Sequence, residues 1–125
     1  MPAKPFLAIA LSCAFLTSCG DNVVEHIGEV TTGGNPHRGA AAISRYGCGT
    51  CHTIAGISGA TGLAGPPLTG IASRIYIAGV LQNTPPNMMR WIRNPKAVDE
   101  KTVMPNLGVS PEDAADISAY LYTLK

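Results

Sequence analysis

The chain has 125 residues and a formal net charge of +1; 46% of its residues are hydrophobic and 14% are charged. This length suits one domain, the low charged fraction argues against disorder, and the lack of a basic run or an interleaved aromatic platform argues against nucleic-acid binding. With two Phe, one Trp and four Tyr, the core is marginal unless another apolar body fills its centre.

Residues 1–18 have the pattern of an export signal, which does not belong to the fold. Lys4 is followed by the apolar run FLAIALSCAFL, which is too short to span a bilayer. The run leads into LTSC, which ends at Cys19 and resembles the lipobox of bacterial lipoproteins, where the cysteine is lipidated and becomes the N-terminus. An ordinary signal peptide, with Cys19 as a bystander, is the alternative. The lipobox pattern predicts a lipid on Cys19, a flexible tether over residues 19–35 and a place on the periplasmic side of a bacterial membrane.

The segment NPHRGAAAISRYG is expected to form the first helix. Asn35 can cap this helix, and Pro36 fits its first turn. Ala40, Ile43 and Tyr46 fall on one face. No buried parallel strand is indicated near this helix.

Directly after this helix, the stretch YGCGTCHTI places Cys48, Cys51 and His52 within five positions. A structural zinc site needs four protein ligands, and no further cysteine remains once Cys13 leaves with the signal and Cys19 takes a lipid. A thioredoxin-like dithiol would open a helix after a strand, whereas a helix precedes this motif. The C-x-x-C-H pattern instead indicates covalent attachment of haem. The two thiols can reach the two vinyl groups on one porphyrin edge, and the imidazole then points at the iron.

Two further helices are expected in the second half of the chain. Thr84 can cap a helix that begins with Pro85 and Pro86 and ends before Pro95. Ser110 can cap the last helix, whose first turn carries acidic residues that suit the positive helix end. The apolar positions of the last helix repeat every three or four residues, at Ala114, Ile117, Leu121 and Leu124.

The haem iron needs a second axial ligand from a segment that crosses to its other face. Met104, in the loop KTVMPNLGVS between two helical patterns, is the candidate, and Pro105 stiffens the strap that carries it. Met88 and Met89 compete for this role, but they fall inside the amphipathic helix, where core packing is the expected use. A buried apolar residue is the alternative interpretation of Met104.

Four separated motifs, GCGTCH, GPPL, RWIRNP and VMPNLG, precede a terminal helix that contains AYL. In this order and spacing they resemble class I cytochrome c over residues 36–125. More narrowly, the part from GPPL to RNP is similar to haem c domains that accompany or are fused to haem–copper oxidases. The resemblance implies an all-α cytochrome c fold, with three main short helices and long loops wrapped around one covalent haem c. This haem would fill the sparse core and couple folding to haem ligation.

The resemblance also implies roles for single residues. The carbonyl of Pro66 would accept the second ring N–H of the proximal imidazole, although this proline also suits a plain turn. Arg74 would approach a haem propionate, or else be a solvated surface arginine. Trp91 would lie on the distal side near the methionine sulfur. Gly39 would let the terminal helix cross the first one closely, with Tyr120 packed near the crossing.

Two strong axial ligands leave the iron no vacant position for a substrate. The sequence therefore predicts a one-electron carrier, not an enzyme, in periplasmic or membrane-surface respiratory electron transfer, with redox partners such as a membrane oxidase or dehydrogenase. From Val30 to Val98 the chain has six Arg and Lys and no acidic residue, which would steer it to acidic surfaces unless these cations merely balance propionates. The alternatives are a haem enzyme or ligand-binding protein with a labile Met104, and a fixed haem c subunit of an oxidase or dehydrogenase complex.

Overall fold

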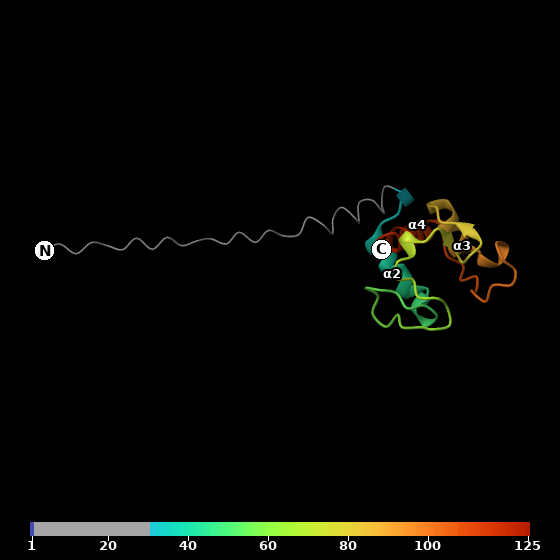
Figure 1. Cartoon of the computed structure of the whole chain (residues 1–125), viewed down its shortest axis with the longest axis horizontal. Helices are drawn as coiled ribbons and strands as arrows, with labels where there is room; N and C mark the ends of the chain where they lie inside the picture. Colours follow the sequence, from blue (N-terminus) through green and yellow to red (C-terminus); the bar gives the residue numbers. More distant parts are fainter. Residues whose placement is uncertain (2–30) are drawn as a thin grey trace.

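The computed structural model describes Met1 and residues 31–125, and these residues contain three α-helices, three short 3-10 turns and one two-stranded antiparallel hairpin (Figure 1). In chain order the elements are α2 (Pro36–Arg45), η1 (Cys48–Thr50), η2 (Ile71–Ser73), β1 (Tyr76–Ile77), β2 (Leu81–Gln82), α3 (Pro85–Arg93), η3 (Pro95–Ala97) and α4 (Pro111–Leu121). The predicted signal, Cys19 and most of the tether fall in residues 2–30, outside the described residues. Among residues 31–125, no helix has both the length and the apolar character that a bilayer crossing requires.

Each α-helix begins at a polar residue that caps its first turn. The side-chain oxygens of Asn35, Thr84 and Ser110 accept hydrogen bonds from backbone N–H groups three residues on, at 3.0, 3.4 and 3.1 Å. A proline follows each cap, where its missing N–H costs nothing because the first turn has no acceptor for it. The three predicted helix starts are therefore confirmed.

Two positions differ from the expected helical faces. Ala40 is only half-buried, because Gly39 and Ala42 occupy the inner side of α2. Leu124 lies past the end of α4, which stops at Leu121. The carbonyl of Leu124 accepts a hydrogen bond from Ala72 N at 3.0 Å, so the tail pairs with η2 instead of extending the helix.

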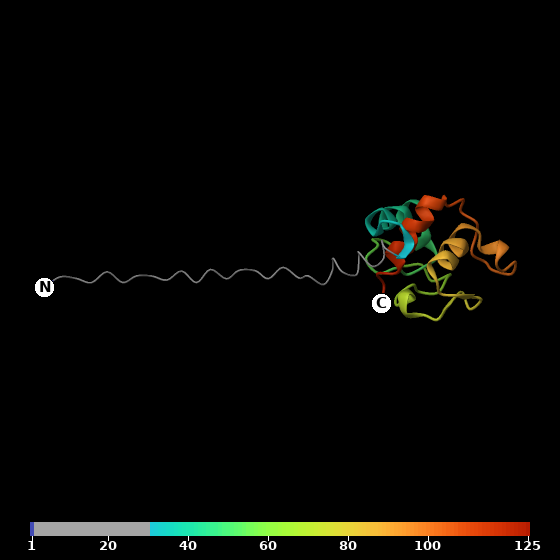
Figure 2. The same ribbon diagram turned by 90° about the horizontal axis from the view of Figure 1, so that it is seen from above.

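The first and last helices cross with their backbones in contact (Figures 1 and 2). A Cβ added at Gly39 would lie 2.1 Å from the carbonyl oxygen of Asp116 and 3.0 Å from Tyr120 Cβ, so only glycine permits this approach. Asp116 is buried and accepts hydrogen bonds from Arg38 Nε and Nη2 at 2.7 and 2.8 Å and from Asn35 N at 2.6 Å. This bidentate pair ties α4 to the start of α2.

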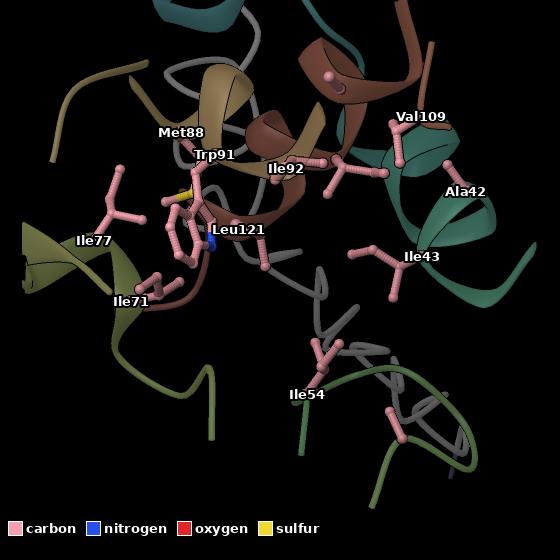
Figure 3. Close-up of a cluster of buried hydrophobic side chains, with 13 residues drawn as sticks. Ala42, Ile43, Ile54, Ile71, Ile77, Met88, Trp91, Ile92, Val109 and Leu121 are labelled. Atoms are coloured by element: carbon pink, nitrogen blue, oxygen red, sulfur yellow. The ribbon is translucent and has the colours of Figure 1, made fainter. Parts of the chain in front are cut away.

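A cluster of buried apolar side chains joins the three helices to the loops between them (Figure 3). Its members are Ala42, Ile43, Ile54, Ala60, Ile71, Ile77, Met88, Trp91, Ile92, Val109, Ala114, Ile117 and Leu121. Met88 is therefore a core residue, as its helical position predicts. The hydroxyl of Ser118 is fully buried and, within the described residues, has no hydrogen-bond partner.

Candidate functional site

The two thiols and the imidazole of the C-x-x-C-H motif are gathered by one short turn. Gly47, with φ of +71°, ends α2 and redirects the chain into η1. The carbonyl of Cys48 accepts hydrogen bonds from Cys51 N at 3.2 Å and His52 N at 3.0 Å, which fixes the three residues relative to one another. Both cysteines are half-buried, and neither forms a disulfide within the described residues. Burial raises the pKa of the Cys48 thiol above its ordinary value.

The His52 ring is held in one orientation by the loop that carries the GPPL motif. Its Nδ1 lies 2.7 Å from the carbonyl oxygen of Pro66, and because a carbonyl can only accept, Nδ1 carries the proton. In the neutral ring, Nε2 then has the free lone pair that a metal ligand needs. This hydrogen bond is the one that the resemblance implies for Pro66.

Gly65 has a role at this site that the sequence did not reveal. A Cβ there would lie 2.4 Å from Cε1 and 2.7 Å from Nδ1 of His52, so any side chain would displace the imidazole. The Gly65 N–H donates to the carbonyl of Cys51 at 2.7 Å, which brings the loop against the motif. The first letter of GPPL was the only signal of this role, and glycine in a loop has many other uses.

Arg74 and Tyr120 brace the two loops that surround the motif. Arg74 Nη2 donates to the carbonyls of Pro67 at 2.6 Å and Thr69 at 3.1 Å, directly after the residue that binds the imidazole. From α4, the Tyr120 hydroxyl donates to the carbonyl of Ala55 at 2.7 Å. The predicted approach of Arg74 to a haem propionate stays a prediction, but its guanidinium has a definite structural use.

Met104 is half-buried and packs against the same apolar cluster that Cys48 contacts. Its N–H donates to the hydroxyl of Thr102 at 3.2 Å. Trp91 is 8% exposed, and its ring lies within the cluster (Figure 3). Among residues 31–125, no hydrogen bond reaches its indole N–H.

These residues fit a covalently attached haem. Two thiols on one turn, an imidazole whose Nδ1 binds the Pro66 carbonyl and leaves Nε2 for a metal, and a thioether form the donor set that haem c takes. Large apolar side chains are also exposed in the loop before Gly65 and directly before Met104: Leu63 is 90% exposed and Val103 is 88% exposed. A porphyrin is a flat apolar group that can cover such side chains.

An open groove of about 740 Å³ lies between α3 and the segment that leads into α4. It is lined by Pro86, Met89, Arg90, Arg93, Asn94, Asn106, Gly108, Val109 and Pro111. None of these residues is acidic. Arg90 and Arg93 are exposed, and among the described residues neither forms an ion pair.

Comparison with known proteins adds two findings. Residues 37–125 match the family whose description is "Cytochrome c". Over 90 residues the chain is 36% identical to "Cytochrome c oxidase subunit 2" of Alkalihalophilus pseudofirmus. The matched part covers 71% of this chain and 25% of that relative, so the chain corresponds to about a quarter of the longer protein.

Proposed function

The chain belongs to the cytochrome c family, and from this premise we propose that it is a one-electron carrier whose haem c iron is bound by His52 and Met104. As a member of this family, the protein takes a covalent haem c, at Cys48 and Cys51, and serves haem-based electron transfer. When bound, haem c supplies an iron that changes between ferrous and ferric states by one electron.

The His52 hydrogen bond is the observation that carries the proposal. With the proton on Nδ1 held by the Pro66 carbonyl, the imidazole can bind iron only through Nε2, in one orientation. Gly65 leaves the ring its space, and Met104 offers a half-buried thioether on a proline-stiffened strap. An iron bound by protein ligands on both faces would rearrange little when its oxidation state changes, and this suits electron transfer better than substrate chemistry.

An optical redox titration of the purified holoprotein tests this proposal. The expected spectrum is low-spin in both states, with a weak near-infrared band in the ferric form that reports a methionine–iron bond. Met104→Ala should abolish that band and lower the midpoint potential, because a soft thioether favours ferrous iron. A five-coordinate, high-spin spectrum of the unaltered protein would instead support a haem enzyme or ligand-binding protein.

The proposed location is the periplasmic side of a bacterial membrane, with the domain held there by a lipid on Cys19. The support is sequence alone: an apolar run of export-signal length that ends at the LTSC motif. The protein would then supply electrons to, or take them from, a membrane oxidase or dehydrogenase. Mass spectrometry of the protein from membranes gives the test, since an unmodified residue 19 would exclude the anchor.

The positive charge of the groove suggests that the redox partners dock through acidic surfaces. Arg90 and Arg93 line the open groove beside Asn106 and Gly108, in the segment that directly follows Met104. Two cations that form no ion pair among the described residues therefore lie beside the segment that follows the candidate distal ligand. We expect Arg90→Gln/Arg93→Gln to slow association with an acidic partner several-fold at low salt, and the difference to vanish at high salt.

A second candidate is a haem c subunit that is fixed in an oxidase complex. The observation in its favour is the relative, because the oxidase subunit 2 carries a segment 36% identical to this chain. Detergent extraction separates the two cases. Stable co-purification of an oxidase with this chain through a high-salt wash would favour the fixed subunit, whereas release as a single haem protein would favour the tethered carrier.

A further inference from the structure

The loop that carries Met104 is held by few bonds. In residues 103–109, no backbone group forms a backbone–backbone hydrogen bond with the described chain. The two hydrogen bonds that exist are local turns: Met104 N–H donates to Thr102 Oγ1 at 3.2 Å, and Gly108 N–H donates to Asn106 Oδ1 at 2.9 Å. The Met104 side chain packs against the apolar cluster, and within the part of the chain that the structure describes its backbone is held by hydrogen bonding only through Thr102.

Thr102 is held from outside the loop by one side chain, Lys96. The Lys96 ammonium donates to the carbonyl of Thr102 and lies 3.5 Å from the carbonyl oxygen of Glu100. Within the described residues, neither carbonyl accepts another hydrogen bond. One ammonium thus closes the turn that precedes Met104, and its bonds to neutral carbonyls are strengthened by its charge.

Lys96 can act as a brace because its own backbone is anchored. It belongs to η3, whose first residue, Pro95, is among the largest fully buried side chains. The Asn94 side chain caps η3 by accepting a hydrogen bond from Ala97 N at 3.2 Å. A continuous path therefore runs from the buried Pro95 through Lys96 to Thr102, the residue that holds the Met104 N–H.

We propose that Lys96 is a positioning residue for Met104, which keeps the loop 99–104 in the conformation that presents the thioether. This inference rests on the proposed role of Met104 as an iron ligand. Without the brace, the loop spends more time in conformations in which the thioether is withdrawn. The apparent affinity for an external ligand rises with the population of those conformations, because the external ligand competes only when Met104 is away.

Imidazole binding to the ferric holoprotein, followed by the near-infrared methionine–iron band, tests the brace. The variant is Lys96→Met, which keeps an apolar stem of similar length and removes every donor. The matched control is Lys101→Met, which removes the same charge from the same loop. Lys101 is exposed, and its ammonium has no hydrogen bond within the described residues; only its backbone N–H is used, toward Asp99 Oδ1 at 3.0 Å.

We expect imidazole to bind about three- to tenfold more tightly to Lys96→Met than to the unaltered protein, the scale of one exposed, charge-assisted hydrogen bond. Lys101→Met should differ by less than about twofold, which is the scale of lost surface charge alone. Lys96→Arg keeps donors at the same place, so its affinity for imidazole should be close to that of the unaltered protein. These three results together would support positioning by Lys96.

Equal shifts in Lys96→Met and Lys101→Met would overturn the brace and leave only a charge effect. An unchanged affinity in Lys96→Met would overturn it as well. In both cases a normal near-infrared band in the unaltered protein would leave the Met104 ligand standing. Absence of that band in the unaltered protein would refute the ligand itself, and the brace with it.

Discussion

Replacing Gly39 with alanine should destabilise the domain, although alanine is the better helix former. A Cβ at this position would lie 2.1 Å from the Asp116 carbonyl oxygen, whereas ordinary contact begins near 3.4 Å, so α2 and α4 would have to separate by about 1 Å. The obstacle is backbone, which cannot rotate away. Overpacking of this kind costs about 3 kcal/mol at the upper end, and the propensity gain returns about 1 kcal/mol. The net loss is about 2 kcal/mol.

Thermal unfolding of the holoprotein, followed by circular dichroism, measures this loss as a midpoint about 8–16 °C lower for a domain of this size. The matched control is Ala41→Gly, the reverse exchange at an exposed position of the same helix. This control isolates the effect of helix propensity and should lower the free energy of unfolding by about 1 kcal/mol. If Gly39→Ala were as stable as the unaltered protein, or more stable, the helices would not be in contact and the explanation of the crossing would be wrong.

Three further outcomes follow from the site and the core. Gly65→Ala should lower the fraction of chains that carry haem, measured by haem absorbance per protein, because its Cβ would lie 2.4 Å from the His52 ring; Ala64→Ser should not. Ser118→Ala should leave chemical-denaturation stability unchanged or raise it by up to about 1 kcal/mol, because the hydroxyl is buried without a partner; a clear loss would reveal a hidden hydrogen bond. Hydrogen bonds from Tyr46, then Ser110, and the Arg45 charge lower the pKa of Asp113. The stability that Asp113 contributes is therefore present above its unfolded pKa of about 4 and is lost as pH falls through the lower folded pKa. Tyr46→Phe should therefore make the free energy of unfolding fall less steeply as the pH is lowered through this range. An unchanged steepness would contradict this account.

The helices could be predicted from the sequence because their signals are local. A cap followed by proline marks each start within two residues, and the C-x-x-C-H motif defines the attachment turn in five. Gly39 followed from the resemblance, and its contact with the last helix is what the structure shows. Met104 and Cys19 remain predictions.

What the sequence did not reveal depends on contacts between distant segments. Gly65 matters because the fold brings it against an imidazole thirteen positions earlier. Arg74 holds backbone carbonyls, a use that its side chain does not signal. The hairpin was missed because two-residue strands are too short for an alternating pattern, and because its turn includes Ala78 at φ of +50°, where glycine or asparagine would have been the usual marker.

The crossing of α2 with α4 determines where further polypeptide can be joined to this domain. Both ends of the domain belong to one helix pair, and the described chain starts and finishes on the same side of the molecule (Figures 1 and 2). A polypeptide joined at either end would leave the loops around the motif untouched. A domain closed in this way can be attached to a short tether or fused to a larger chain. Its similarity to about a quarter of a longer oxidase subunit is consistent with such fusion.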